Sequence, residues 1–195
     1  MSIILETDRL VLRPFVEDDV EAVQRNVSLW EIARMTTRIA HPYPEGAAAD
    51  WIAGHGEARA KAQEHTFAIT EDAGENEGSC AIEPIIGAIS LRKLEPGNYE
   101  LGYWLAPECW GRGLATDAAR AMVVFGFEKL YAEALQSGHF IDNLASGRVL
   151  QKAGFAANGV ARQWSAARQG FVDAHRLLLT RETWQRARQD MDKAP

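Results

Sequence analysis

The strongest constraint on the fold is a passage in which a strand pattern runs through two glycines into a helix pattern. The strand is expected over residues 98–106 (NYELGYWLA), the turn contains Gly111 and Gly113, and the helix is expected from Leu114 to about Leu130. Apolar residues recur along the helix at one-face spacing: Leu114, Ala118, Ala121, Met122 and Phe125. The passage therefore predicts a helix with one buried face, whose N-terminus is held at the end of a strand.

A strand, a glycine turn and a helix in this order suit the binding of an anion. The helix N-terminus offers unpaired N–H groups, and glycines let a ligand approach the backbone. A tight strand-to-helix turn that binds no ligand explains the two glycines equally well. A Walker A loop needs GxxxxGK[ST], which the chain lacks, and a dinucleotide fingerprint needs a third glycine where Thr116 stands. The pattern favours neither of these nucleotide sites.

The rest of the chain alternates between strand and helix patterns. Strands are expected at 7–15, 66–70, 85–94, 98–106, 135–141, 155–164 and 171–180, and further helices at 17–27, 50–62, 143–153 and 181–191. The acidic, glycine-containing segment 71–78 is expected to form a hairpin loop. No internal repeat or low-complexity linker divides the chain, so residues 1–195 are predicted to form one mixed α/β or α+β domain.

Composition limits the classes of function. The formal net charge of −6 argues against nucleic acid as the main partner. The two cysteines form no CxxC pair, and the five histidines show no metal-ligand spacing, so no metal is expected. No apolar run approaches the roughly 20 residues of a membrane span, and the start of the chain does not read as a secretory signal. A soluble cytoplasmic protein with no membrane partner is the expectation.

Four segments, in order, carry a family resemblance. ETDRLVLRPFVEDD, YELGYWLAPECWGRGLATDAARAMVVFGF, DNLASGRVLQKAGF and LTRETW together span nearly the whole chain. They resemble the GNAT superfamily of acetyl-CoA-dependent N-acetyltransferases, in its branch of ribosomal-protein N-terminal acetyltransferases. The resemblance implies a strongly bent mixed sheet of about seven strands flanked by helices. It also implies that acetyl-CoA binds in a cleft where two strands splay apart.

The resemblance assigns the glycine turn to acetyl-CoA. The family's loop [QR]xxGx[GA] matches residues 108–113 in its glycines, while Glu108 departs from the first position. Backbone amides from Arg112 to Thr116 are then expected to hold the CoA pyrophosphate, and Asn143 the pantetheine arm. The full set implied to bind acetyl-CoA is Leu105, Trp110, Gly111, Arg112, Gly113, Leu114, Ala115, Thr116, Asn143 and Ser146.

Two residues are predicted to be catalytic. Glu100, expected on one strand face with Gly102 and Trp104, is the predicted base for the amine; a solvated carboxylate, or one that binds the acceptor's cation, are the alternatives. Ser146, in the segment NLAS, is the predicted acid or hydrogen-bond donor to the departing sulfur. The alternative for Ser146 is an ordinary first-turn residue in a helix capped by Asn143.

The acceptor is expected to be a primary amine, either a protein N-terminus or a small molecule. Residues 28–62 are expected to line its entrance, with Trp30 and Tyr43 as aromatic walls, although core packing explains both equally well. The protein is expected to be a monomer or a homodimer. The rival function is a module that binds acyl-CoA without catalysing transfer, as a sensor or interaction partner.

Overall fold

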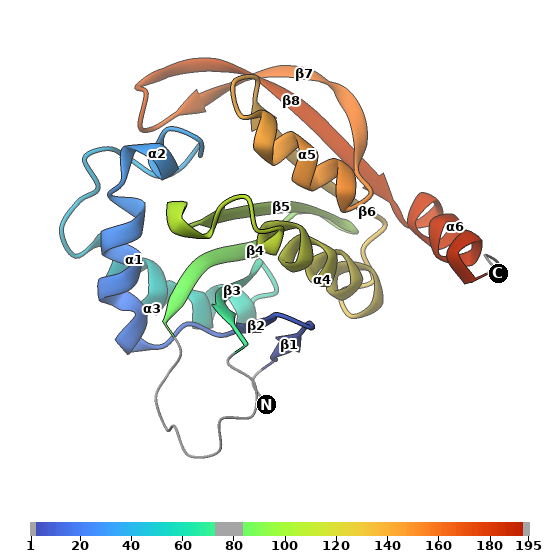
Figure 1. Cartoon of the computed structure of the whole chain (residues 1–195), viewed down its shortest axis with the longest axis horizontal. Coiled ribbons are helices and arrows are strands. Elements are labelled where there is room, and N and C mark those ends of the chain that lie inside the picture. The colour runs from blue at the N-terminus through green and yellow to red at the C-terminus, as the bar shows by residue number, and fades with distance from the viewer. Residues whose placement is uncertain (1–2, 73–83, 193–195) are drawn as a thin grey trace.

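The computed structural model describes residues 3–72 and 84–192, which form one sheet with helices on both faces (Figure 1). The strands are β1 Leu5–Glu6, β2 Leu10–Arg13, β3 Glu64–Glu71, β4 Ile85–Glu95, β5 Asn98–Leu105, β6 Ala134–Phe140, β7 Ala156–Ser165 and β8 Gly170–Thr180. The helices are α1 Val20–Val27, α2 Trp30–Ala33, α3 Ala47–Ala60, α4 Leu114–Glu128, α5 Leu144–Lys152 and α6 Arg181–Asp192. Short 3-10 turns, η1 Glu17–Asp19 and η2 Pro107–Cys109, precede α1 and α4.

The sheet divides at its one parallel pair. The strand order is β1-β2-β3-β4-β5-β6-β8-β7, and every pair is antiparallel except β5 with β6. That pair is in register only from Asn98↔Ala134 to Glu100↔Gln136, although both strands continue. The Ser137 hydroxyl donates to Leu101 O (2.9 Å) where the ladder ends. The expected splayed pair is therefore present, and it lies between β5 and β6.

The eighth strand, beyond the seven expected, is the two-residue β1. Leu5 pairs with Leu12, so the chain folds back on β2 almost at once. The Thr7 side chain closes this turn by accepting from the Leu10 amide (2.9 Å), while the Thr7 amide donates to Leu10 O (2.9 Å). A strand of two residues is too short to produce an alternating pattern, which is why the sequence did not indicate it.

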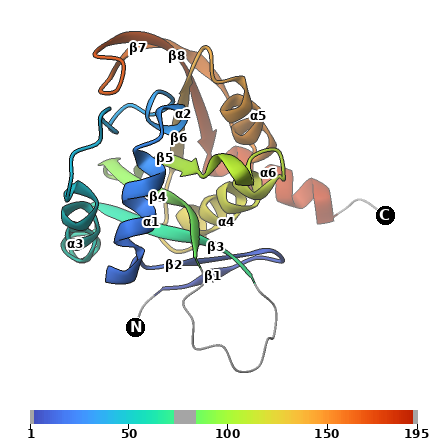
Figure 2. The ribbon, with the colours of Figure 1, turned by 60° about the vertical axis from the view of Figure 1, so that its left-hand side comes forward.

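Two hydrophobic clusters occupy the two faces of the sheet. Helices cover both of these faces (Figure 2). On one face α4 packs through Leu114, Ala118, Met122 and Phe125, the apolar stripe predicted from its spacing. On the other face α1, α2 and α3 cover a smaller cluster that includes Trp104 of β5. Because β5 contributes to both clusters, it is buried on both faces.

Several boundaries differ from the predicted ones for local reasons. The helix expected over 17–27 begins as η1, because Asp19 pairs with Arg13 (2.7 and 2.8 Å) and accepts from the Val16 amide (2.9 Å). Helix α3 begins at Ala47, three residues early, after Gly46 turns the chain with φ +78°. The four-residue α2 was not expected. Most of the predicted hairpin loop lies in residues 73–83, outside the described residues.

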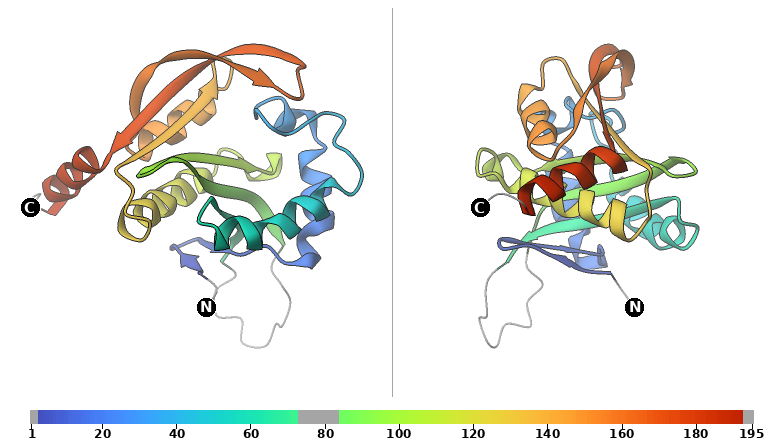
Figure 3. Two further views of the ribbon diagram at one scale, coloured as in Figure 1. Left: turned by 180° about the vertical axis from the view of Figure 1, so that it is seen from behind. Right: turned by 90° about the vertical axis from the view of Figure 1, so that its right-hand side faces the viewer.

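The C-terminal helix α6 forms as predicted and lies at the end of α4 (Figure 3). Trp184 stacks on Phe127 with ring centroids 4.8 Å apart, and Arg181 donates to the carbonyls of Phe127 (2.7 Å) and Ala132 (2.9 Å). Among the described helices, none is long and apolar enough to cross a membrane.

Candidate active site

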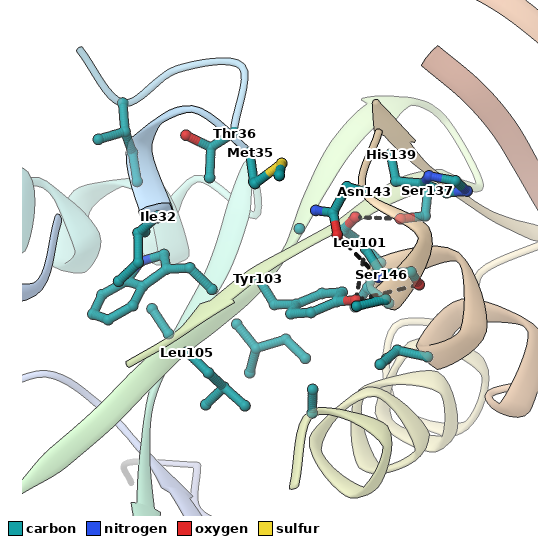
Figure 4. Close-up of a pocket in the computed structure, with 18 of the residues that line it drawn as sticks. Ile32, Met35, Thr36, Leu101, Tyr103, Leu105, Ser137, His139, Asn143 and Ser146 are labelled. Atoms are coloured by element: carbon teal, nitrogen blue, oxygen red, sulfur yellow. Dashed lines mark hydrogen bonds between the residues drawn. The ribbon is translucent and has the colours of Figure 1, made fainter. Parts of the chain in front are cut away.

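A cavity of about 940 Å³ passes through the splay between β5 and β6 (Figure 4). One end is lined by the loop after β5 and by the first turns of α4 and α5; the other end is lined by α1, α2, the segment 35–39 and α3. Residues 100–105 of β5 lie along it between the two ends. A ligand that occupied both ends would pass the unpaired edge of β5.

The N-terminus of α4 faces this cavity with unpaired amides. Gly111 (φ +76°) and Gly113 (φ +83°) turn the chain in the left-handed region, which an L side chain rarely adopts. The amides of Thr116 and Asp117 donate back to Gly113 O, but those of Gly113, Leu114 and Ala115 have no acceptor within the described chain. Such amides at a helix N-terminus are suited to an anion.

The arginines around this loop brace it from outside. Arg112, predicted to bind acetyl-CoA, turns its side chain to Glu71 (Nη1–Oε1 2.8 Å) and is not among the described residues that line the cavity. Arg9 donates to Asp117 Oδ2 (2.8 and 2.6 Å) and to Arg112 O (3.0 Å). The Arg112 side chain is therefore not placed to bind an anion in the cavity, and only its backbone is available for that role. The role of Arg9 had no sequence signal, since it lies 108 residues from Asp117.

Asn143, Ser146 and Tyr103 meet at the splay (Figure 4). Asn143 Oδ1 accepts from the Ser146 amide (3.1 Å), so Asn143 caps α5 as predicted. The Tyr103 hydroxyl lies 2.8 Å from Ser146 Oγ. Burial raises the pKa of Tyr103 to about 12, although the hydrogen bond to Ser146 opposes the shift. The phenol is therefore protonated at neutral pH. Sequence reasoning missed Tyr103, whose only signal was its place on β5 opposite the face of Glu100.

Glu100 lies on the other face of β5, in the predicted company of Trp104. Strand β5 pairs with β4 in unbroken register from Tyr99 to Leu105, so alternation holds along it. Glu100 accepts a hydrogen bond from Arg92, its cross-strand partner, and its other oxygen lies 3.7 Å from Arg176 Nη1 of β8. The carboxylate lines the cavity with 27% of the side chain exposed. An amine that approaches it competes with two guanidinium groups.

Sequence reasoning also missed two cations at the end of the cavity that is lined by α4 and α5. Arg148 and Lys152 are one turn apart on α5 and both line the cavity. Neither has a carboxylate partner among the described residues. Their i, i+4 spacing in the predicted helix 143–153 was the available signal.

The end of the cavity lined by α1, α2 and α3 is walled by aromatic rings, but not by the expected pair. Tyr43 lines the cavity, and burial raises its pKa. Trp30 is 43% exposed, packs against His41 (centroids 5.2 Å apart) and is not among the lining residues described; Trp51 of α3 is. The Trp30 side chain therefore lies outside the described cavity lining, and the sequence pattern did not reveal this.

His139 and His175 face each other across β6 and β8 with ring centroids 5.1 Å apart. The His139 ring touches α5 so closely that a Cβ at Gly147 would lie 2.6 Å from His139 Nε2. Cys109 is buried beside the glycine loop, and burial raises the pKa of its thiol. Both His139 and Cys109 are also among the described residues that line the cavity.

The family model described as "Acetyltransferase (GNAT) domain" matches residues 9–156, which include β5, the glycine loop, α4 and α5. The chain belongs to the GNAT acetyltransferase family. It is an acyl-CoA-dependent acetyltransferase by family, and the resemblance seen in its sequence motifs is confirmed.

Relatives of this GNAT protein agree with the assignment. It is 30% identical to the uncharacterized N-acetyltransferase YoaA of Bacillus subtilis over 178 residues, which cover 83% of this chain and 87% of the relative. It is 28% identical to the ribosomal-protein-serine acetyltransferase of Escherichia coli over 100 residues, 48% of this chain and 53% of the relative. The solved structure of RimL, a ribosomal L7/L12 alpha-N-protein acetyltransferase in complex with coenzyme A, shares the fold: the TM-score is 0.77 at 17% identity, with 91% of this chain and 98% of that one covered.

Proposed function

We propose that this GNAT protein transfers the acetyl group of acetyl-CoA directly to a primary amine, either a protein N-terminal α-amine or that of a small molecule. The observation that carries the proposal is the single cavity that joins the free amides of α4, the Tyr103–Ser146 pair and the walls at Tyr43 and Trp51. The two reactants can therefore enter from opposite ends and meet at the splay.

The residues at the α4 end suit acetyl-CoA, which supplies the reactive thioester when bound. The unpaired amides of residues 113–115 suit its pyrophosphate, and Arg148 and Lys152 suit its other negative charge. The unpaired edge of β5 beyond Leu101 offers backbone groups to the pantetheine arm. This arrangement holds the thioester beside Ser146.

Tyr103 and Ser146 are suited to assist the departing sulfur. A phenol that stays protonated can donate to Ser146 Oγ, and in that arrangement the Ser146 proton is free to turn into the cavity. A hydroxyl polarised in this way stabilises a developing thiolate by a hydrogen bond. We assign Ser146 the contact with sulfur and Tyr103 the task of orienting Ser146.

We assign Glu100, on the other face of β5, to the incoming amine. An α-amine with a pKa of about 7.7 to 8.0 is partly neutral at pH 7.4, whereas a lysine near 10.4 must be deprotonated against about 3 pH units, roughly 4 kcal/mol. A carboxylate already held by Arg92 and Arg176 suits the smaller task. Of its predicted roles, we favour orienting the amine and accepting its proton through water.

The names of relatives support an amine acceptor without choosing its kind. One relative is the ribosomal-protein-serine acetyltransferase of Escherichia coli, and another is an FsC-acetyl coenzyme A-N(2)-transacetylase of Aspergillus fumigatus. A protein N-terminus and a small molecule both remain within the proposal.

The test is a calorimetric titration with acetyl-CoA, with ATP and NAD as controls, followed by a thiol-release screen. The screen would include peptides beginning with Ser or Ala, polyamines and aminoglycosides. Micromolar binding of acetyl-CoA alone, with thiol release on one acceptor class, is the expected result. Binding without release on any amine would favour the acyl-CoA sensor, and no binding would overturn the proposed ligand.

A further inference from the structure

The turn between β7 and β8, residues 166–169, lies against the segment 34–37 that follows α2 (Figures 1 and 3). The Ala166 amide donates to Thr37 O (3.0 Å), and Arg168 Nε donates to Arg34 O (2.8 Å). Ser165 is fully buried and Ala167 is 8% exposed. The tip of the C-terminal hairpin is thus packed on the N-terminal wall of the acceptor end.

One carboxylate, that of Asp142, joins this contact to the start of α5, the turn Asn143–Ser146. Arg168 Nη2 donates to both oxygens of Asp142 (2.8 and 3.1 Å), and Arg34 Nη2 donates to Asp142 Oδ2 (3.2 Å). Asp142 immediately precedes Asn143, the cap of α5 that holds the Ser146 amide. Three segments far apart in sequence therefore meet at Asp142: the acceptor wall, the hairpin tip and the start of α5.

Asp142 is 39% exposed in this cluster, and Arg168 is its more buried partner. The Arg168 side chain is 21% exposed and lies over the Phe140 ring, 5.0 Å from its centroid. Burial alone would raise the pKa of Asp142, but its hydrogen bonds with Arg168 and Arg34 hold that pKa below its ordinary value. The carboxylate is ionised at neutral pH and accepts hydrogen bonds from two cations, the stronger kind of hydrogen bond.

Both sides of the cluster line the reaction cavity. Met35, Thr36 and Thr37 form part of the acceptor wall, while Asp142 and Asn143 lie at the thiol end. A displacement of about 1 Å between two reacting groups lowers a rate by as much as about 100-fold. The relative placement of these two walls therefore bears directly on turnover.

We propose that Asp142 is a positioning residue that, through Arg34 and Arg168, fixes the acceptor wall 34–37 against the turn Asn143–Ser146 and so sets where the amine stands relative to the thioester. The inference rests on the proposed function of Ser146 and of the cavity. It assigns Asp142 no contact with either reactant.

The decisive variant is Asp142→Asn, which keeps the shape and removes the charge. With a peptide beginning with Ser or Ala, or with spermidine, the KM for the acceptor is expected to rise about tenfold, while the Kd for acetyl-CoA stays within twofold. Hydrogen exchange at residues 34–37, measured with acetyl-CoA bound, is expected to accelerate about tenfold. A role in stability alone would not separate the two reactants in this way.

Glu128→Gln is the matched control, because it removes the charge from the contact of Arg188 with Glu128, which also joins two elements but lies away from the cavity. It should change neither constant nor the exchange. Arg34→Gln, which leaves the Arg168 contacts in place, should act in the same direction more weakly and covers the case in which Asp142→Asn does not fold. Unchanged exchange and acceptor KM would overturn the inference, as would an equal rise in the Kd for acetyl-CoA. If the wild-type chain turns over no amine, the proposed function fails, and the exchange at 34–37 still decides whether Asp142 holds the wall.

Discussion

Tyr103 of β5 and Ser146 of α5 bring their hydroxyl groups to one position in the cavity. The Tyr103 hydroxyl reaches Ser146 Oγ at 2.8 Å from β5, and Asn143 holds the Ser146 amide from α5. Each side chain alone has an ordinary explanation, Tyr103 as a core aromatic and Ser146 as a first-turn residue. Their hydrogen bond inside the cavity argues for a shared role at the sulfur.

Ser146→Ala is expected to lower kcat by about 10- to 100-fold, because it removes one donor to a developing charge. Tyr103→Phe, which leaves Ser146 in place without its partner, is expected to lower kcat by about 3- to 10-fold. Neither should change the Kd for acetyl-CoA more than a few fold. Steady-state kinetics of thiol release, with binding measured separately, checks both, and full kcat in both variants would show that the sulfur needs no side-chain donor.

At the scale of elements, α5 presents Arg148 and Lys152 to the cavity at i, i+4, and neither has a carboxylate partner in the described part of the chain. Replacing both by Ala is expected to raise the Kd for acetyl-CoA by about tenfold or more, since charge-assisted contacts to phosphate are lost. The acceptor KM should stay within twofold. The measurement is a titration at low and at 0.5 M salt; a wild-type affinity that is insensitive to salt would contradict the assignment of these cations to phosphate.

Helix α3 carries a half-buried histidine, His55, whose environment makes stability depend on pH. The His55 ring lies between Phe15 and Trp51 (centroids 5.2 and 4.4 Å), and its two nitrogens, both buried, have no hydrogen-bond partner among the residues that the structure describes. Burial lowers the pKa of His55 to about 4. In the unfolded chain, a histidine binds a proton with a pKa of about 6.5. The contribution of the neutral ring to the stability of the folded protein is therefore complete above that pH. It is lost as the pH falls from 6.5 towards 4.

The free energy of unfolding of the wild-type chain is therefore expected to decrease between pH 7.5 and 4.5, by an amount that reaches about 3 kcal/mol at most. His55→Leu should be less sensitive to pH over this range, whereas His41→Gln, at an exposed histidine, should follow the wild type. Urea unfolding at several pH values measures the difference. Parallel curves for wild type and His55→Leu would mean that His55 is solvated in the folded protein.

At the scale of the whole molecule, the two parts of the sheet meet along a short β5–β6 ladder of three residue pairs, extended by the Ser137–Leu101 hydrogen bond. A ligand along the splay contacts both parts and stabilises the folded state by mass action. At about 100 times its Kd, acetyl-CoA should add roughly 2.7 kcal/mol, which corresponds to a rise in Tm of about 5–10 °C. Thermal melts with acetyl-CoA, ATP and NAD test this; an equal rise with ATP would indicate a site for phosphates alone.

The sequence by itself determined the elements whose causes are local. The stripe from Leu114 to Phe125 predicted the buried face of α4, the turn at Gly111 and Gly113 predicted its N-terminal site, and Asn143 predicted the cap of α5. Alternation along β5 predicted the face that Glu100 shares with Trp104. Spacing and capping act over a few residues, so each leaves a pattern that can be found without the fold.

Only the tertiary structure decided which distant side chains meet. Tyr103 and Ser146 are 43 residues apart, Arg9 and Asp117 are 108 apart, and Arg34 reaches Asp142 from 108 residues away. Tyr103, Ser146 and Asp142 line one cavity at the splay between β5 and β6, and the β7–β8 hairpin packs on the segment 34–37, part of which lines the same cavity. Contacts of this kind depend on chain topology, because they form where separate elements pack together and have no period or spacing in the sequence.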